Sequence, residues 1–329
     1  MQSTDITVLK QLQKWIEGGH TVWLATVLKT YGSSPRQPGA MCAIRDDGVL
    51  VGSVSGGCIE DDLMDKAHNG FLAEKDIIFQ TYGESIEERD RFRLPCGGTL
   101  RLSVEKITDT DWVSTVLEKI EQRQQVRRLL SLADKKSVIA PANRFNDLVT
   151  EAPKQLGFVY GPRYRLLLIG AGETSSYLAK MATALDYQVL VAEPREEMQS
   201  SWLAEDGELL PMMPDDAVIK IEPDSTTAII TLSHDPKLDD MALLEALKSD
   251  AFYIGALGSK RTNTKRRERL AMFDLTQEQI ARLHGPVGLD IGSKTPAEIA
   301  VSILAELVQI RRFEQDMTQH HEIRAISNG

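Results

Sequence analysis

The sequence has few cysteines and no long apolar run. Its three cysteines, Cys42, Cys58 and Cys96, are spread over 329 residues, which argues against a disulfide framework and favours a reducing cytoplasm. No apolar stretch reaches the roughly 18 residues that indicate a membrane-spanning helix, and no basic segment followed by an apolar one opens the chain. We therefore expect neither a membrane anchor nor a signal peptide.

Positive charge is also scarce. The chain has 38 Lys and Arg against 48 Asp and Glu, a formal net charge of −10, which argues against a general nucleic-acid binder. Its six histidines form no HExxH motif, and no two cysteines form a CxxC motif, so the sequence contains no recognisable zinc site. An anionic small ligand is still compatible with this composition, since it needs only a local basic pocket.

The chain is long enough for about two domains, and its two halves differ in pattern. Residues 1–155 contain short strand patterns separated by glycine-rich loops, whereas strand and helix patterns alternate over residues 156–313. Such alternation is typical of a parallel α/β sheet. We therefore predict an α/β protein with an N-terminal β-rich α/β domain, a C-terminal Rossmann-like parallel α/β domain and a polar tail at residues 314–329, with the domain boundary between residues 150 and 162.

A glycine motif follows the first strand pattern of the second domain. The motif GAGETS (residues 170–175) stands between an apolar run and a predicted helix. In a Rossmann fold the first two glycines, here Gly170 and Gly172, allow a tight turn and the close approach of a phosphate. Glu193 lies 23 positions after Gly170, where such folds place a ribose-binding carboxylate. A second interpretation stays open, in which the glycines serve packing alone; the acidic Glu173 disfavours a tightly held pyrophosphate.

A polar tripeptide follows another buried strand pattern. Residues 227–232 run directly into Ser233-His234-Asp235. Because ligands of open α/β sheets bind at the carboxyl ends of the strands, we predict that His234 and Asp235 belong to the site. The alternative is structural: Asp235 caps the helix that begins at Pro236, and His234 is simply solvated.

A basic segment follows the next predicted strand. Gly258 and Ser259 lead into Lys260 and Arg261 at the start of a helix. Cations in a first helical turn oppose the helix dipole, so we expect an anion such as a phosphate at this position. The alternative is a solvated basic face, which we expect for residues 266–269 further along the helix.

The three cysteines differ in their surroundings. Cys42 alternates with apolar residues in a strand pattern, which predicts a small core residue. Cys58 follows Gly56 and Gly57 and precedes a predicted helix, and Cys96 stands against another glycine pair. Either these two thiols are inert in buried turns, or they perform soft sulfur chemistry, as a thiolate that touches a metal centre or carries a persulfide. The helix start and the neighbouring acids shift the pKa of Cys58 in opposite directions.

Together these motifs resemble one known family, the xanthine dehydrogenase accessory factors (the XdhC/CoxI family). The resemblance covers residues 10–312, and its motifs are specific in combination, whereas GxG alone is common. The matching segments are 32–40 (GSSPRQPGA), 52–60 (GSVSGGCIE), 96–98 (CGG), 170–172 (GAG), 233–235 (SHD), 253–261 (YIGALGSKR), 288–292 (GLDIG) and 295–300 (TPAEIA).

The resemblance implies a cytoplasmic maturation factor rather than an enzyme. Members bind the molybdenum cofactor, protect it, support its sulfuration by a cysteine desulfurase and deliver it to a xanthine dehydrogenase-type molybdenum hydroxylase. The cofactor phosphate suits Lys260 and Arg261, and its soft dithiolene–metal end suits the loop cysteines. Many members carry His where this chain has Glu173, so the identity of the ligand of the Rossmann-like domain stays open. Two further alternatives also stay open: whether the cofactor is molybdopterin or its dinucleotide form, and whether the protein is a homodimer.

Two other functions are compatible with the same residues. An NAD(P)-dependent oxidoreductase would use the Rossmann-like domain, with His234 as an acid or base, but it leaves both cysteine loops without a role. A binding-only protein would keep a nucleotide such as NAD(P) as a structural or regulatory ligand. We recognise no catalytic residue and no metal ligand set, which favours the accessory factor.

Overall fold

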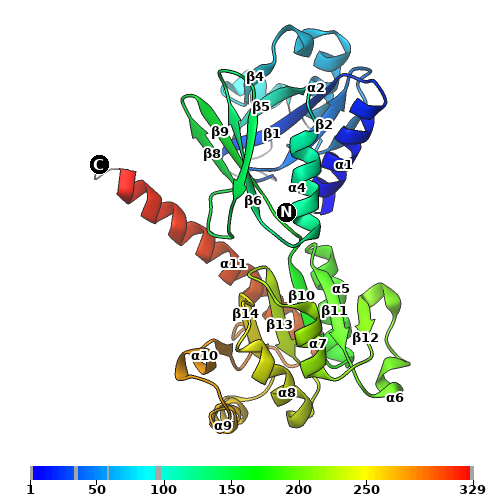
Figure 1. The fold of residues 1–329 in the computed structure, drawn as a ribbon, viewed down its shortest axis with the longest axis vertical. Coiled ribbons are helices and arrows are strands. Elements are labelled where there is room, and N and C mark those ends of the chain that lie inside the picture. The colour runs from blue at the N-terminus through cyan, green and yellow to red at the C-terminus, as the bar shows by residue number, and fades with distance from the viewer. Residues whose placement is uncertain (1–2, 33–35, 58, 93–97, 327–329) are drawn as a thin grey trace. The chain divides into compact units, whose positions relative to one another are not determined.

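The chain divides between Pro162 and Arg163 into two units in a computed structural model (Figure 1). The structure describes residues 3–32, 36–57, 59–92 and 98–326, with side chains up to residue 312. The sequence analysis places the domain boundary between residues 150 and 162, with 155 as the last residue of the first domain. Strand β9 (Gln155–Tyr160) pairs with two strands of the first unit, so the division by contacts falls after β9, at the end of that range.

The first unit contains two antiparallel sheets, with strand orders β3-β2-β1-β5-β4 and β7-β6-β9-β8. Successive side chains of β1 point to opposite faces: Leu24 lies in the core that contains α1 and α4, whereas Trp23 and Ala25 lie in the core that contains α2. The strands are β1 (Val22–Tyr31), β2 (Met41–Arg45), β3 (Leu50–Gly52), β4 (Ile77–Tyr82), β5 (Thr99–Ile107), β6 (Val126–Ser131), β7 (Ser137–Pro141), β8 (Val149–Ala152) and β9. The helices are α1 (Ser3–Glu17), α2 (Glu60–His68), η1 (Phe71–Glu74), α3 (Ile86–Arg91) and α4 (Asp111–Glu121).

A buried ion pair connects the two sheets of this unit. Arg128 of β6 is 1% exposed and binds the carboxylate of Glu105 of β5 with both terminal nitrogens, Nη1 at 2.8 Å from Oε2. Its Nε donates to the Ser137 hydroxyl at 2.8 Å, and its guanidinium lies 3.7 Å from the ring centre of Trp112. The charge of Arg128 is therefore fully compensated inside the core.

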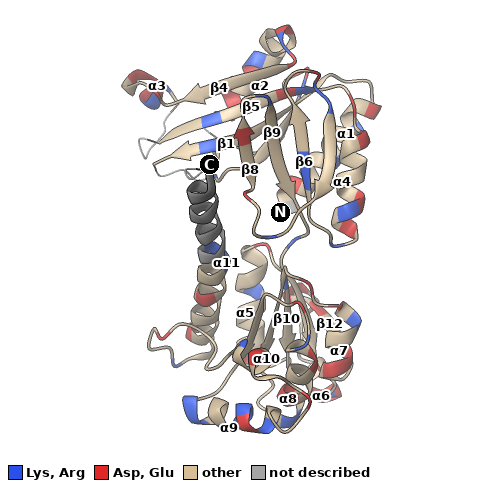
Figure 2. Ribbon diagram, turned by 60° about the vertical axis from the view of Figure 1, so that its left-hand side comes forward, with Lys and Arg blue, Asp and Glu red and all other residues tan. Residues whose placement is uncertain are grey.

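The second unit is a six-stranded parallel sheet covered on both faces (Figures 1 and 2). Its order, β12-β11-β10-β13-β14-β15, confirms the predicted Rossmann-like fold. Helices α5 and α11 pack on one face, and α7 and α8 on the other. The strands are β10 (Arg165–Ile169), β11 (Gln188–Ala192), β12 (Glu208–Leu210), β13 (Thr227–Thr231), β14 (Tyr253–Ala256) and β15 (Leu283–His284). The helices are α5 (Glu173–Ala184), α6 (Glu196–Gln199), η2 (Ala204–Asp206), α7 (Pro214–Ile221), α8 (Pro236–Ala246), α9 (Lys260–Leu270), α10 (Gln277–Ala281) and α11 (Pro296–Ile326).

Helix α11 begins with a capping box. The Thr295 backbone N–H donates to Glu298 Oε2 at 2.9 Å, and the Glu298 N–H donates to Thr295 Oγ1 at 3.4 Å. The segment expected to be a polar tail from residue 314 is helical as far as Ile326. Within the described ranges, no helix is both long and apolar enough to cross a membrane.

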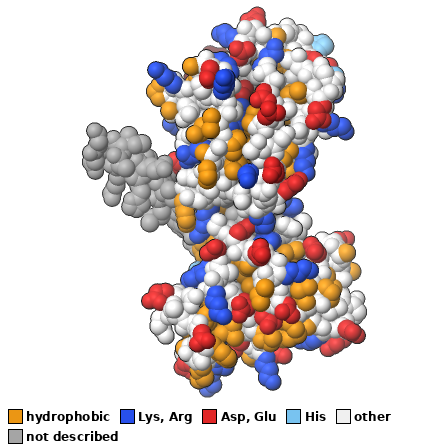
Figure 3. Space-filling model, in the orientation of Figure 1, with side chains coloured by type: hydrophobic (Ala, Val, Ile, Leu, Met, Phe, Trp, Pro, Cys, Tyr) orange, Lys and Arg blue, Asp and Glu red, His pale blue; other side chains and the backbone are white. Residues whose placement is uncertain are grey.

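Charges of both signs are mixed on the surface. Figure 3 shows Lys and Arg interspersed with Asp and Glu on the face that it draws. One exposed pair joins β5 to β8, with Arg101 Nη2 at 2.6 Å from Glu151 Oε1. Because water screens such exposed pairs, this one contributes little to stability.

Candidate functional site

Cys58 and Cys96, both predicted to contact the cofactor, lie outside the described residues. Cys42 is described: it is fully buried in β2, and burial raises the pKa of its thiol. This confirms its predicted place in the core. Next to Cys58, the structure describes the loop residues on either side.

The described residues of this loop, 53–57 and 59, surround one carboxylate. Glu60, the first residue of α2, is 6% exposed. Its oxygens accept from the backbone N–H groups of Val54, Ser55, Gly57 and Ile59, at 2.8, 2.9, 2.9 and 3.2 Å, and from the hydroxyls of Ser53 and Ser55. Burial raises the pKa of Glu60, but these hydrogen bonds outweigh burial and lower it to about 2. The sequence analysis did not identify this role, because an acid in a first helical turn usually faces solvent.

Two exposed glycines form the outer part of the same loop. Gly56 has φ of +90° and Gly57 has φ of +123°, a backbone region that side chains other than glycine rarely adopt. A Cβ on Gly57 would meet nothing within 4 Å. The glycines are therefore required by backbone conformation, and the space beside Gly57 is open to a ligand.

In the second unit, the two glycines of the GxG motif have different surroundings. Gly170 has φ of +99°, and a Cβ there would lie 2.5 Å from Ser233 Cα. Gly170 therefore allows the ends of β10 and β13 to approach closely. Gly172 caps α5, and a Cβ there would meet nothing within 4 Å. Packing explains the first glycine, whereas the second faces open space at the start of a helix.

Glu193, predicted to bind a ribose, is bound by protein donors instead. It is 0% exposed. Oε1 accepts from the backbone N (3.0 Å) and Nε (2.8 Å) of Arg195, and Oε2 accepts from Nη2 of Arg195 (2.8 Å) and from the backbone N of Ala171 (3.1 Å). A carboxylate offers about four acceptor positions, so this one is saturated. Although burial raises the pKa of Glu193, its hydrogen bonds lower it overall. In this conformation Glu193 has no acceptor position left for a ribose hydroxyl.

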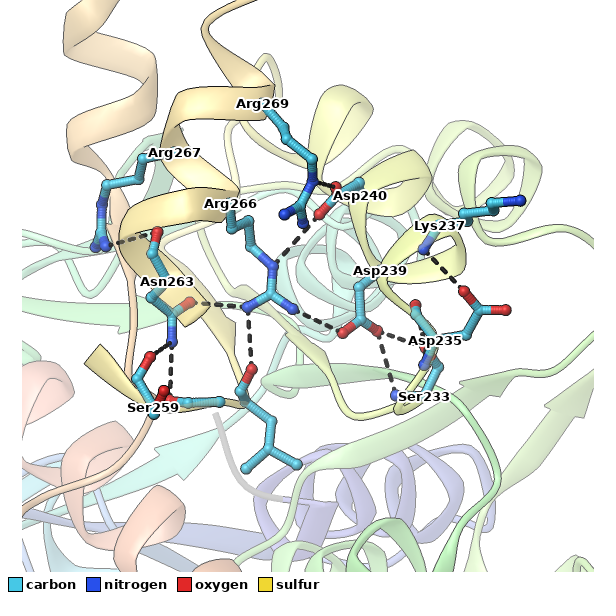
Figure 4. Close-up of polar contacts among 12 residues, drawn as sticks. Ser233, Asp235, Lys237, Asp239, Asp240, Ser259, Asn263, Arg266, Arg267 and Arg269 are labelled. Carbon is cyan, nitrogen blue, oxygen red and sulfur yellow. Dashed lines mark hydrogen bonds and ion pairs between the residues drawn. The ribbon is translucent and has the colours of Figure 1, made fainter. Parts of the chain in front are cut away.

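The Ser233-His234-Asp235 loop is fixed on both sides of its histidine (Figure 4). Ser233 donates to Asp239 Oδ1 from its backbone N (3.2 Å) and its hydroxyl (2.7 Å). Asp235 caps α8 by accepting from the backbone N of Lys237 at 2.9 Å, as the structural interpretation expected. His234 is exposed and has φ of +60°. A positive φ is uncommon for residues other than glycine, so His234 stays a candidate ligand contact.

Arg266 lies behind this loop and is not on a solvated face. It is 2% exposed, and Figure 4 shows its guanidinium between α8 and α9. Nη2 donates to Asp239 Oδ2 at 3.0 Å, and Nη1 donates to Leu257 O at 3.0 Å. The solvated face expected for residues 266–269 is therefore wrong for Arg266, because its partner stands 27 positions away on another helix. Two further arginines of the segment are also engaged: Arg267 Nη2 with Leu283 O at 2.8 Å and Arg269 Nε with Asp240 Oδ2 at 2.6 Å.

The basic turn at the start of α9 is exposed. Ser259 caps the helix by accepting from the backbone N of Thr262 at 3.1 Å, and Gly258 before it has φ of +130°. The side chains of Lys260 and Arg261 are exposed and make no hydrogen bond or ion pair with the part of the chain that the structure describes. They are available to an anionic ligand.

A cluster that the sequence did not reveal joins β14, β15 and α11. Glu306 accepts from Tyr253 Oη at 2.7 Å and from the backbone N of Gly288 at 2.6 Å, and lies 3.0 Å from His284 Nδ1. The Tyr253 and His284 rings stack, with centres 4.5 Å apart. Among the residues described, no group of three or more His, Cys, Asp or Glu side chains could hold a metal ion.

Comparisons with known proteins give matches in both units. The profile described as the XdhC and CoxI family matches residues 15–83, and that of the XdhC Rossmann domain matches residues 166–307. The molybdenum cofactor insertion chaperone PaoD of Escherichia coli (strain K12) is 28% identical over 313 residues, 94% of this chain and 90% of that protein. A probable xanthine dehydrogenase component of Bacillus subtilis (strain 168) is 24% identical, over 92% of this chain and 96% of that protein.

A solved structure shares the fold of both units. The crystal structure of a protein from Bacillus halodurans, described as a xanthine dehydrogenase, has a TM-score of 0.70 and 26% sequence identity, covering 92% of this chain and 95% of that one. The residues matched by the two profiles include the GGC loop, the Rossmann-like sheet and the basic turn of α9. With profiles of one family matched in both units, the chain belongs to the XdhC and CoxI family.

Proposed function

We propose that this protein binds the molybdenum cofactor and inserts it into a xanthine dehydrogenase-type hydroxylase. The observation that carries the proposal is the similarity to a molybdenum cofactor insertion chaperone over 94% of the chain, which includes both units. In this proposal the protein acts in the cytoplasm and supports sulfuration of its cargo by a cysteine desulfurase. The desulfurase contact, the form of the cofactor and a homodimer stay predictions.

Each unit, taken by itself, has residues that suit one chemical group of such a cargo. Molybdenum cofactor carries an anionic phosphate at one end and a soft dithiolene–metal group at the other. The exposed Lys260 and Arg261 at the start of α9 suit the phosphate, since backbone N–H groups and cations at a helix N-terminus attract anions. Cys58, beside the exposed Gly56 and Gly57, suits the sulfur end.

The second candidate is an NAD(P)-dependent oxidoreductase, which the strand order of the second unit favours. Two observations count against it. Glu193, which would bind the ribose, has its acceptor positions filled by Arg195 and Ala171. No acid–base partner accompanies His234 among the described residues, since neither a hydrogen bond nor an ion pair of its side chain is present.

A reconstitution distinguishes the two functions. Apo-hydroxylase and sulfurated cofactor are mixed with increasing amounts of this protein, and hydroxylase activity is measured. A carrier gives activation that saturates near one equivalent per hydroxylase site, whereas an NAD(P)-dependent oxidoreductase gives no activation. Reproducible NAD(P)H oxidation with a small carbonyl substrate, abolished by His234→Ala, would overturn the carrier function.

A further inference from the structure

We propose that Glu60 is a positioning residue that holds the 53–59 loop in the shape needed for cofactor handling. This rests on the proposed function, which gives Cys58 in that loop its role. Backbone N–H groups on both sides of Cys58 in the sequence, those of Gly57 and Ile59, donate to the same oxygen of Glu60 at 2.9 and 3.2 Å. One carboxylate therefore fixes the chain immediately before and after the cysteine.

The direction of these hydrogen bonds separates Glu60 from an ordinary helix cap. A capping side chain satisfies N–H groups of the helix that it begins. Glu60 instead reaches backwards, to N–H groups one, three, five and six positions earlier in the chain. Its partners are loop residues, so its contribution is to the conformation of the loop rather than to that of α2.

The hydroxyls of the loop are part of the same arrangement. Ser53 Oγ donates to Glu60 Oε1 at 2.7 Å and accepts from the backbone N of Gly56 at 2.9 Å. Ser55 Oγ donates to Glu60 Oε2 and accepts from the backbone N of Ile59 at 2.9 Å. Ser53 thus links the carboxylate to one further N–H group, that of Gly56, and Ser55 gives the N–H of Ile59 a second acceptor. Without the charged acceptor, several backbone donors of the loop would face one another with no partner.

The test is Glu60→Gln in the full chain. Gln keeps the size but presents an amide NH₂ to N–H donors, so the loop can no longer close around it. We expect amide exchange in a peptide covering residues 53–59 to rise at least tenfold and iodoacetamide labelling of Cys58, read by peptide mapping, to rise at least threefold. Cofactor retained on purification should fall. Buried Cys42 should stay unlabelled. Labelling of Cys42 would indicate a general loss of structure.

The matched control is Asp61→Asn. It removes the same charge from the next residue of α2, which is exposed and makes no contact that the described residues show, so exchange and labelling should equal those of the wild type. If Cys42 becomes labelled in Glu60→Gln, that variant has lost its fold, and Ser53→Ala is used to test the positioning role. Ser53→Ala removes one hydroxyl donor to Glu60 and leaves the carboxylate in place. If a folded Glu60→Gln variant shows the amide exchange and the Cys58 labelling of the wild type, Glu60 has no positioning role. This holds whatever amount of cofactor the variant retains. If Cys58→Ser retains as much cofactor as the wild type, the role proposed for Cys58 is wrong. The amide-exchange result for Glu60→Gln would still stand.

Discussion

Three buried carboxylates bind the backbone of loops that contain predicted site residues. Glu60 holds the loop around Cys58, Glu193 binds the N–H of Ala171 in the GxG turn, and Asp239 binds the N–H of Ser233 beside His234. Hydrogen bonds lower the pKa of Glu60 and Glu193, whereas burial raises that of Asp239. At the residue scale, the loops are therefore shaped by acceptors of this chain before any ligand arrives.

Two cysteine substitutions distinguish a residue of the proposed site from a residue of the apolar core. We expect Cys58→Ser to lower cofactor retention or sulfuration and to leave the unfolding free energy unchanged, because Cys58 directly follows the exposed Gly57 in the sequence. Cys42→Ser places a hydroxyl in the fully buried position of β2 and should cost about 1–3 kcal/mol if that hydroxyl is unpaired. Cofactor co-purification and urea unfolding measure the two effects. Equal retention for Cys58→Ser and the wild type would remove Cys58 from the site.

The pair of Glu105 and Arg128 offers a stability test. Glu105→Gln leaves a guanidinium that is 1% exposed without a charged partner, which should destabilise the protein by about 3–5 kcal/mol. Glu151→Gln breaks the exposed pair with Arg101 and should cost no more than about 1 kcal/mol. Urea unfolding of both variants gives the comparison. Similar losses for the two would mean that Arg128 finds another acceptor in the core.

At the scale of elements, the start of α9 is the predicted phosphate position. Lys260→Glu places an anion in that first turn, so affinity for a pterin phosphate or a nucleotide should fall at least tenfold, about 1.4 kcal/mol. Calorimetry with both proteins measures this, and Lys265→Glu, further along the same helix and also exposed, is the control. If the wild type gives no heat with any phosphate ligand, the glycines and the basic turn have no part in phosphate binding.

The loop before α2 should also show a defined pH dependence. The folded-state pKa of Glu60 is about 2, below its ordinary value of 4.5. A depressed carboxylate pKa contributes stability that is complete above the ordinary value and is lost as pH falls towards the folded value. We expect the amides of Val54 and Gly57 to stay protected from exchange at neutral pH and to lose protection between about pH 4.5 and 2. Protection that is constant across this range would contradict the charged state of the Glu60 carboxylate.

On the scale of the whole molecule, each unit has its own apolar core. We therefore expect residues 163–329 to fold when expressed alone, with one cooperative transition and an unfolding free energy on the order of 5–15 kcal/mol. Urea unfolding followed by circular dichroism tests this. A broad, non-cooperative change would show that the Rossmann-like unit needs residues of the first unit to fold.

The sequence by itself determined the type of fold, the Rossmann-like half and the place of Cys42 in the core. These follow from local patterns, because apolar spacing sets which face of a strand or helix is buried. The caps at Asp235 and Thr295 were predictable for the same reason, since a cap involves residues two or three positions apart.

Only the tertiary structure decided which charged side chains are buried with a partner and which are exposed. Arg266 is buried because Asp239 on another helix compensates it, and the hydrogen bond that completes the set around Glu193 comes from Ala171, 22 positions earlier in the chain. Sequence spacing predicts that a charge is present but not whether a distant partner reaches it. Since burying an uncompensated charge is costly, the arrangement of the whole fold determines which charges are buried with partners and which, like Lys260, stay available to a ligand.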